Sequence, residues 1–227
     1  MVAHTTGGRP RGCRRARQTG DWPALMRLFE TLAQILSRLE EQGARMALLG
    51  GLAVSTWTEP RFTRDVDLAV AVQTDAEAER LIYWLSQAGY RLLATVEQTA
   101  ASRLATARLL PPGESPEGMI VDLLFASSGI EPEIVEAAVQ VDIGAGTPVR
   151  VACVGHLVAL KLLAHDPVSR PQDAIDLRAL RTVLDPKEER RAREACELIA
   201  RRGYHRRRDL PALLDAFLAG RIQAQSQ

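Results

Sequence analysis

The sequence predicts an α/β (α+β) fold, in which a small mixed β-sheet flanked by helices is followed by a C-terminal helical bundle. Up to about residue 154, short apolar runs typical of strands alternate with helix-like segments. From His156 onward the apolar residues recur only at helical spacing. The chain has 227 residues, of which 46% are hydrophobic, and this is enough to bury one large core or two small ones.

The elements before residue 155 are predicted from apolar runs and from the residues that start or stop helices. Asp21 and Asp75 can each cap a helix, and a glycine shortly after each helix ends it. A Gly50-Gly51 turn leads into a short helical segment that Pro60 stops. The expected helices are Asp21–Glu41, Leu52–Thr58 and Asp75–Ala88. The expected strands are Arg45–Leu49, Asp65–Val72, Tyr90–Val96, Ser102–Leu110, Met119–Phe125 and Pro148–Val154.

The C-terminal part is predicted to be helical and the N-terminal tail to be unstructured. Helices are expected at about 156–165, 171–184, 187–202 and 209–219. Residues 1–20 are rich in Gly, Arg and Thr and have almost no large apolar side chains, so we expect a disordered basic tail. The predicted organisation is therefore a tail at 1–20, a core domain at 21–154 and a helical domain at 155–227.

Composition restricts the classes of function. Aromatic residues make up only 4% of the chain, which argues against a nucleic-acid platform built on stacked rings. The formal net charge is +1, but the arginines form two clusters. They are Arg9, Arg11, Arg14, Arg15 and Arg17 in the first, and Arg201, Arg202, Arg206, Arg207 and Arg208 in the second. These clusters either contact an RNA backbone or form a disordered tail and a solvated helix face.

The cysteines and the hydropathy pattern indicate a cytoplasmic protein. Cys13, Cys153 and Cys196 lie far apart without a CxxC motif, so neither a zinc site nor a disulfide framework is expected. No apolar run approaches the roughly 18 residues that cross a membrane. The Arg-rich N-terminus lacks the apolar segment of a secretory signal.

The most informative stretch is 48–70, LLGGLAVSTWTEPRFTRDVDLAV, because it places two acids one residue apart in an expected strand. The side chains of Asp65 and Asp67 then point to the same face. Two such charges about 4 Å apart repel each other by about 4 kcal/mol at an effective dielectric of roughly 20. A divalent cation makes the arrangement favourable, and the Gly50-Gly51 turn beside it provides a place for a phosphate. Metal plus phosphate is therefore the first hypothesis.

Three further polar residues lie in or beside apolar segments. Asp122 lies within Met-Ile-Val-Asp-Leu-Leu-Phe, where a carboxylate needs a cation, either an arginine at a strand end or a metal. With Asp65 and Asp67 it would provide the three carboxylates of a phosphoryl-transfer site with two metal ions. Lys161 lies in an apolar helix, where it either reaches an anion or extends to solvent. His165 shares its face and is expected to be a surface histidine or an assisting group.

Other charged residues around these positions admit two interpretations. Arg61 and Arg64 flank the aspartates and either clamp a phosphate or balance the local charge. A self-paired helix surface is expected from Arg170, Asp173, Asp176, Arg178 and Arg181. Walker, GxSxG, HExxH and kinase motifs are absent from the sequence, so no other chemistry competes well.

These motifs resemble those of a known group of enzymes. The pattern LLGGLAV…PRFTRDVDLAV, a later strand with Asp122, and LVALKLLAHDPVSRPQDAIDLRAL are similar to the minimal nucleotidyltransferases of the DNA polymerase β superfamily. The nearest branch is the AbiEii-type toxin nucleotidyltransferases, and the resemblance covers about Leu48 to Leu180. It implies a small mixed sheet with a helical C-terminal half, an NTP donor and a magnesium-dependent transfer of a nucleotide.

The resemblance implies a catalytic set in this chain. Asp65 and Asp67 would bind two Mg²⁺ ions, with Mn²⁺ as an alternative. Asp122 would be a third ligand or the base for the acceptor hydroxyl. Lys161 would complete the set by contacting the triphosphate, and Arg64 would belong to the substrate-binding residues.

The resemblance also implies how the remaining substrate contacts are made. Gly50 and Gly51 would face the β- and γ-phosphates. Asp173 or Asp176 would match an acid of the following helix. Most of the family carries Gly-Ser where this chain has Gly50-Gly51, which removes one phosphate hydrogen bond worth about 0.5–1.5 kcal/mol.

Three functions are compatible with the sequence. The leading hypothesis is a toxin that transfers a nucleotide from an NTP to a tRNA 3′ end, with the RNA on the basic C-terminal helices and an antitoxin as partner. The second is transfer to a small molecule such as an aminoglycoside or lincosamide antibiotic. The third is a non-catalytic nucleotide-binding module, which only the missing serine supports.

Overall fold

The computed structural model describes residues 22–61, 63–99, 101–115, 117–143, 148–166 and 169–221. The tail predicted at residues 1–20 lies outside these residues. The strands are β1 (Arg45–Leu48), β2 (Asp65–Ala71), β3 (Arg91–Gln98), β4 (Arg103–Leu110), β5 (Ile120–Leu124), β6 (Val139–Asp142) and β7 (Pro148–Val151). The helices are α1 (Trp22–Glu41), α2 (Gly50–Trp57), α3 (Asp75–Gln87), α4 (Glu131–Ala137), α5 (Val154–Ala164), α6 (Pro171–Thr182), α7 (Pro186–Arg201) and α8 (Leu210–Leu218).

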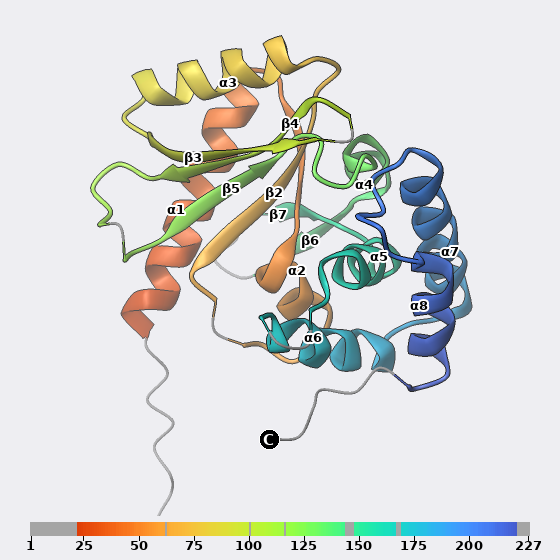
Figure 1. Cartoon of the computed structure of the whole chain (residues 1–227). Coiled ribbons are helices and arrows are strands. Elements are labelled where there is room, and N and C mark those ends of the chain that lie inside the picture. The colour runs from red at the N-terminus through yellow and green to blue at the C-terminus, as the bar shows by residue number, and fades with distance from the viewer. Residues whose placement is uncertain are drawn as a thin grey trace, which may run out of the picture.

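The strands form one mixed sheet in the order β3-β4-β5-β2-β1-β7-β6 (Figure 1). In its centre β2 pairs in parallel with β5 and antiparallel with β1, and β1 pairs in parallel with β7. The antiparallel hairpins β3–β4 and β6–β7 form the two edges. The helices α1, α2 and α4 contact β2, and Val66 and Leu68 to Val70 are buried.

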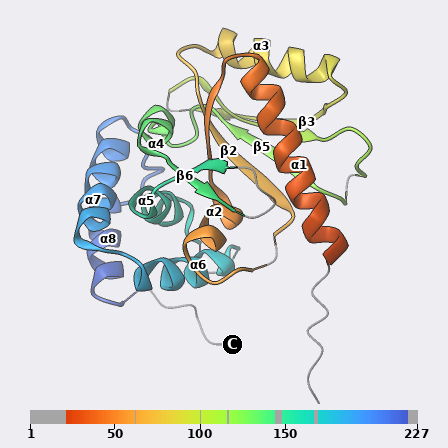
Figure 2. The ribbon, with the colours of Figure 1, turned by 180° about the vertical axis from the view of Figure 1, so that it is seen from behind.

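Helices lie against the sheet and beside it. Figure 2 shows α1 lying across the back of the sheet. Leu28, Leu32, Ile35 and Leu39 share one face of α1 and are buried, as their helical spacing predicts. The helices α5 to α8 pack on one another beside the sheet, with α5 in contact with each of the other three (Figure 1).

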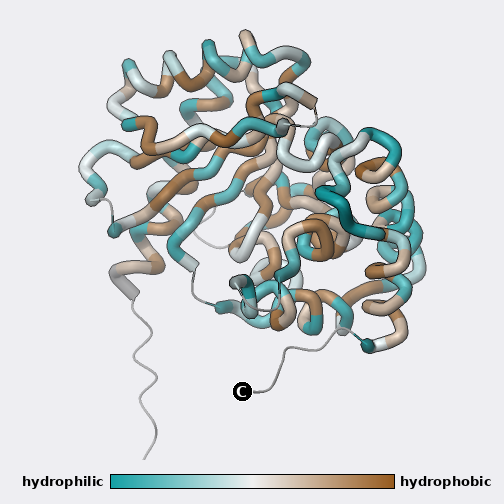
Figure 3. The backbone as a smooth tube through the Cα atoms, in the orientation of Figure 1, coloured by the Kyte–Doolittle hydropathy of each residue, from teal (hydrophilic) through white to brown (hydrophobic). Residues whose placement is uncertain are grey.

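The helix α5 is the centre of this second helical layer. Its sequence VGHLVALKLLA is apolar on every side, and most of its residues are buried. A helix that is apolar all round is expected in a core rather than at a surface. In Figure 3 the central strands and α5 are accordingly largely hydrophobic. This packing brings Lys161 of α5 to the sheet.

The structure confirms the predicted fold class, and the predicted elements are found in order with ends that differ by at most three residues. Gly50 and Gly51, predicted as a turn, are the first two residues of α2. The helix α4 and the strand β6 were missed. The helix α4 has only seven residues, fewer than two full turns. The strand β6 is as short as β1 and β7 but is mostly exposed, so it lacks the buried apolar residues that mark those two strands. No helix among the described residues is long and apolar enough to span a bilayer.

Candidate active site

A cleft of about 470 Å³ collects most of the predicted site residues. Its walls come from the start of α2, from β2 and β5, and from α5 and α6. The predicted residues that line it are Gly50, Gly51, Asp65, Asp67, Asp122, Lys161 and Asp173. Asp176 does not line the cleft but forms an ion pair with Lys161, which does. Arg64 is exposed and is not among the lining residues.

The register of the sheet places three acids, the carboxylate row Asp65, Asp67 and Asp122, in this cleft. Asp67 of β2 lies directly opposite Asp122 of β5. On the other side of β5, Arg108 of β4 lies opposite Asp122 and binds it with two hydrogen bonds. Arg108 Nε donates to Asp122 Oδ1 at 2.9 Å and Nη2 donates to Oδ2 at 2.6 Å. Asp122 therefore has an arginine partner, one of the two outcomes expected for it.

The carboxylate row is short of positive charge at its centre. Burial, then the negative charges of Asp122 and Asp65, raise the pKa of Asp67 to about 6. The pKa of Asp65 is raised chiefly by burial and then by Asp122. Asp122, through its hydrogen bonds, raises the pKa of Arg108. A cation bound near Asp67 would relieve this repulsion.

The donor chemistry of the carboxylate row suits a hard divalent ion such as Mg²⁺, which prefers carboxylate oxygens. In the part of the chain that the structure describes, however, no three ligating side chains are arranged to hold one metal ion. Arg108 already binds both oxygens of Asp122, although each oxygen keeps a further lone pair. The role of Asp65, Asp67 and Asp122 as metal ligands thus stays a prediction, and a metal ion at Asp122 would compete with Arg108.

We expect Arg108→Gln to make the protein more responsive to divalent ions. Without the arginine, the carboxylate row loses its adjacent cation, so the metal-free protein should lose about 1–2 kcal/mol of stability at pH 8. The shift of the melting temperature on adding Mg²⁺ or Mn²⁺ should grow, because the ion no longer competes with Arg108. Thermal unfolding with and without the ion measures both effects. An unchanged ion-induced shift would argue against competition at Asp122.

Gly50 brings the start of α2 against the carboxylate row. Its backbone has φ +61°, which favours glycine, and a Cβ there would overlap the carboxylate of Asp67. The neighbouring Leu49 N–H donates to the Asp67 carbonyl at 2.8 Å. The first amides of α2 therefore lie next to Asp67, where a helix N-terminus can bind an anion.

The space beside Gly51 is filled by Arg61. A Cβ on Gly51 would lie 2.6 Å from Arg61 Nη2, so a serine would displace the guanidinium. This is a structural reason for the departure from the Gly-Ser pattern that the resemblance implies. Arg61, one of the two arginines expected to clamp phosphate or balance charge, lines the cleft at this point.

Gly50→Ala should destabilise the protein by about 2–4 kcal/mol, because left-handed strain adds to a collision with Asp67. Gly43→Ala is the matched control. Its φ is +66°, but nothing lies within 4 Å of an added Cβ, so only the strain of about 1–2 kcal/mol is expected. Urea unfolding of the two variants measures the difference. Equal losses of unfolding free energy in the two variants would show that a side chain at position 50 does not collide with Asp67.

Lys161 is bound between two buried acids of α6. Its Nζ lies 2.7 Å from Asp173 Oδ1 and 2.7 Å from Asp176 Oδ2. Asp173 and Asp176 are only 4% and 1% exposed. Lys161 thus reaches anions rather than solvent. The prediction that these acids belong to a self-paired helix surface is wrong, because tertiary packing covers that face of α6 and pairs it with α5 and Arg61.

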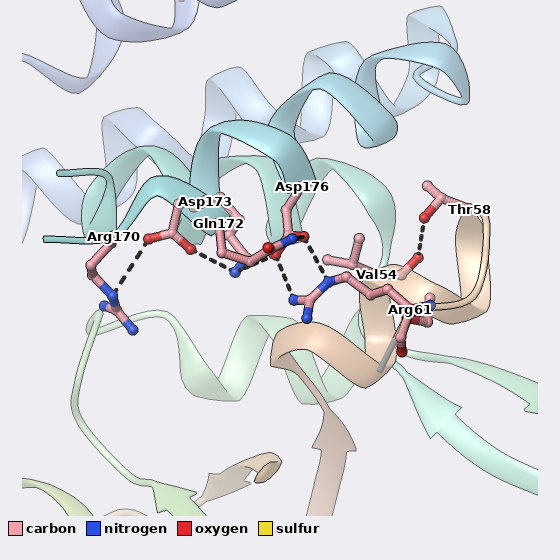
Figure 4. Close-up of polar contacts among 9 residues, drawn as sticks. Val54, Thr58, Arg61, Arg170, Gln172, Asp173 and Asp176 are labelled. Atoms are coloured by element: carbon pink, nitrogen blue, oxygen red, sulfur yellow. Dashed lines mark hydrogen bonds and ion pairs between the residues drawn. The ribbon is translucent and has the colours of Figure 1, made fainter. Parts of the chain in front are cut away.

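The structure separates the roles of the two acids. Asp176 binds Lys161 and also accepts from Arg61 Nε and Nη2, each at 2.9 Å (Figure 4). Burial alone would raise the pKa of Asp176, but Lys161 and Arg61 outweigh it and lower the pKa. Asp173 instead links Lys161 to Arg170, whose Nε is 3.6 Å away. Asp176 therefore positions two cations of the cleft, and Asp173 faces the cleft itself.

Three lining or neighbouring residues differ from expectation. His165 is buried, and its Nδ1 has no hydrogen-bond partner among the described residues, so the surface assignment is wrong. Arg108 was not predicted, although it alternates with apolar neighbours in RLATARLL, because its partner depends on strand register. Arg206 belongs to the predicted basic cluster, but only the fold places it in this cleft.

The mixed sheet and the cleft together define the class of this protein. Two strand carboxylates beside a glycine-led helix N-terminus, facing a buried lysine, are the groups that an enzyme needs to hold a triphosphate and transfer a nucleotide. The protein is a nucleotidyltransferase. The profile described as the nucleotidyl transferase AbiEii toxin of a type IV toxin–antitoxin system matches residues 34–226, and the chain belongs to this AbiEii family. Membership implies an NTP donor and an antitoxin partner.

Solved structures similar to this chain include two other proteins. One is an antigenic nucleotidyltransferase-like protein from Paracoccidioides brasiliensis, with 18% identity over 86% of this chain and 93% of that chain, and a TM-score of 0.48. The other is the antibiotic-resistance factor ANT(2″)-Ia. Its solution structure has 17% identity over 83% and 88% of the two chains and a TM-score of 0.42. Its complex with adenylyl-2″-tobramycin has 17% identity over 84% and 97%, and a TM-score of 0.41. No curated protein matches the chain.

Proposed function

We propose that this protein transfers a nucleotide from an NTP to an RNA hydroxyl, at a tRNA 3′ end in the cytoplasm, in a reaction that depends on Mg²⁺. Within its family it would act as a toxin held in check by an antitoxin. The observation that carries the proposal is one cleft that is lined both by the carboxylate row and by five cations. The acids suit metal ions, and the cations suit a polyanionic substrate.

The donor would bind along the start of α2. The N-terminal amides of α2 and the cations Arg61 and Lys161 would contact its phosphates. Asp65 and Asp67, joined by Asp122, would hold Mg²⁺, which would neutralise charge on the triphosphate. Asp176 would keep Lys161 and Arg61 in place through the contacts it makes with both.

The transfer itself would be an in-line displacement. The acceptor hydroxyl oxygen forms a bond to the α-phosphorus, the bond from that phosphorus to the bridging oxygen of the β-phosphate breaks, and pyrophosphate leaves. As the alternative to its role as a metal ligand, Asp122 would take the proton of the acceptor hydroxyl. The cations beside the triphosphate stabilise the charge that collects on the leaving group.

The basic C-terminal cluster favours RNA over a cationic drug as the acceptor. The cleft itself is nearly balanced in charge, since its lining combines the cations Arg61, Arg108, Lys161, Arg170 and Arg206 with the acids Asp65, Asp67, Asp122 and Asp173. The predicted basic cluster at 201–208, of which Arg206 lines the cleft, would attract an RNA backbone and would repel an aminoglycoside. All three acids of the carboxylate row are present in the cleft, which speaks against a module without turnover.

The proposal is tested by supplying each α-labelled NTP with Mg²⁺ and either total tRNA or a panel of aminoglycosides and lincosamides. Label in tRNA that depends on Mg²⁺ is the expected result, and mapping of the labelled end identifies the attacking hydroxyl. Label in a drug would replace RNA by a small-molecule acceptor. If no acceptor is labelled by the parent, and the parent and Asp67→Asn give the same result, nucleotide transfer is contradicted.

A further inference from the structure

The loop between α7 and α8, residues 202–209, inserts one arginine into the active-site cleft. Arg206 lines the cleft together with Arg170 from the start of α6. In Figure 3 this loop is the strongly hydrophilic segment that runs beside α5. The other members of the predicted basic cluster, Arg201, Arg202, Arg207 and Arg208, are not among the residues that line the cleft. Arg206 is therefore the member of that cluster that lines the cleft.

The loop holds Arg206 in a defined and strained conformation. Arg206 and Arg207 have φ values of +51° and +62°, a region that residues other than glycine adopt rarely. The Arg207 N–H donates to His205 Nδ1 at 3.0 Å, and the Arg208 N–H donates to the His205 carbonyl at 2.8 Å. Tyr204 is buried against Gly129. The loop is thus braced on both sides of the arginine that it presents.

Arg206 has no carboxylate partner among the described residues. Its Nη2 donates to the carbonyl and to the Oγ of Ser127, at 3.1 and 3.2 Å, and both acceptors are neutral. By contrast, Arg202 binds Glu133. Arg206 is exposed to solvent on one side, and partial desolvation and then the charges of Arg170 and Arg208 lower its pKa. Arg206 and Arg170 therefore line one cleft close enough to repel each other, and only Arg170 has a carboxylate partner there, Asp173.

The position of Arg206 separates it from the proposed phosphate site of the donor. Arg206 binds the segment that follows β5, whereas Gly50 follows β1. In the sheet, β2 with Asp67 lies between β5 and β1. A donor triphosphate held at the start of α2 and at Lys161 leaves the β5 side for the other substrate.

We propose that Arg206, together with Arg170, binds a backbone phosphate of the acceptor RNA and so sets the position of its reacting end. This inference rests on the proposed function, because it requires an RNA acceptor. A guanidinium pair can bind a phosphate with two or more charge-assisted hydrogen bonds. A bound RNA phosphate would then be the anionic partner of Arg206, and the strained loop would hold the guanidinium in position for it.

The test compares Arg206→Asn, Arg206→Lys and Arg193→Ala in the full chain. Asparagine tolerates a left-handed backbone but cannot bind phosphate as a cation, and lysine keeps the charge. Arg193 is a control on α7, where it pairs with Glu189 and Asp215 outside the cleft. The probe is an RNA hairpin that carries a tRNA acceptor stem and 3′ end. Its affinity is measured without NTP by fluorescence anisotropy at several salt concentrations, and transfer kinetics follow.

Arg206→Asn should raise the Kd and the KM for the hairpin about tenfold and leave the KM for NTP and the urea midpoint unchanged. The slope of log Kd against log salt concentration should decrease by about 0.7–0.9, which is the change expected when one phosphate contact is lost. Arg206→Lys should restore most of the affinity, and Arg193→Ala should behave as the parent. A raised KM for NTP with normal RNA binding would move Arg206 to the donor and overturn the inference. So would hairpin binding equal to that of the parent, or a lowered midpoint that Arg206→Lys does not repair. If the parent labels only a small molecule, the proposed function fails and the inference fails with it.

Discussion

Asp67→Asn is expected to abolish nucleotide transfer, by about 10³-fold or more, and at the same time to stabilise the metal-free protein. Loss of a metal-binding carboxylate removes several kcal/mol of transition-state stabilisation. The stabilisation follows because Asp67 lies between Asp65 and Asp122, and its charge is disfavoured by burial and by both neighbours. Asparagine has nearly the same shape and removes this repulsion. Transfer assays and urea unfolding in EDTA measure the two effects.

The stabilisation by Asp67→Asn should depend on pH. The pKa of Asp67 is about 6 in the folded protein, whereas the ordinary value of an aspartate is 3.8, so the folded state binds more protons between these values. Stability of the parent should therefore fall as the pH rises through this window, by up to about 3 kcal/mol from this group. The deficit is complete above about pH 7 and absent below about pH 4. Asp67→Asn should flatten this part of the profile.

Glu30→Gln provides the control for this experiment, because it neutralises an exposed carboxylate on α1. It should change neither transfer nor the pH profile. If Asp67→Asn retained transfer near the parental rate, the carboxylate row would not be the catalytic centre. If it destabilised the metal-free protein at pH 8, the repulsion inferred for Asp67 would be absent.

Lys161→Met is expected to have the largest effect on stability, a loss of about 3–5 kcal/mol, together with loss of transfer. The substitution leaves Asp173 and Asp176 buried without the cation that both contact. Breaking a buried ion pair on one side has a penalty of this size. Asp176 keeps its hydrogen bonds from Arg61, so the loss comes chiefly from Asp173, whose other cationic partner, Arg170, is 3.6 Å away. Urea unfolding and the transfer assay with labelled NTP measure the two losses.

A second substitution distinguishes the structural from the chemical role of Lys161. Adding Asp173→Asn to Lys161→Met should recover part of the lost stability, since one unpaired charge is gone, but it should not recover transfer. Lys187→Met is the matched control, as Lys187 is exposed on α7. Recovery of transfer in the double variant would show that Lys161 acts only by neutralising Asp173.

The elements of this protein, and the presence of Asp65, Asp67 and Asp122 in one cleft, could be predicted because their signals are local. The spacing of Asp65 and Asp67 places both on one face of β2, whatever the rest of the chain does. The apolar surroundings of Asp122 and Lys161 in the sequence indicate that each needs a partner. The helix α4 and the strand β6 left no such signal, because α4 has only seven residues and β6, an edge strand, is mostly exposed.

The partners of these charges could not be predicted. Asp122 meets Arg108 because β4 and β5 pair in one particular register, and a shift by one residue would turn the arginine to the other face. Asp176 meets Arg61 across 115 positions of sequence. Separation in sequence also explains the wrong interpretation of α6. Its charged residues look like a solvated surface in the sequence, but Lys161 of α5 packs on them in the fold.

The order of the secondary structure, the amphipathic α1, the apolar α5 and the acids of the carboxylate row follow from the chain's own periodicity and burial preferences, which act within a few residues. Only the folded protein shows which cation pairs with which acid. It also shows why position 51 is a glycine and why Arg206 lines the cleft. Electrostatic pairing depends on distances of a few ångströms between segments far apart in the chain, and only strand register and helix packing set those distances.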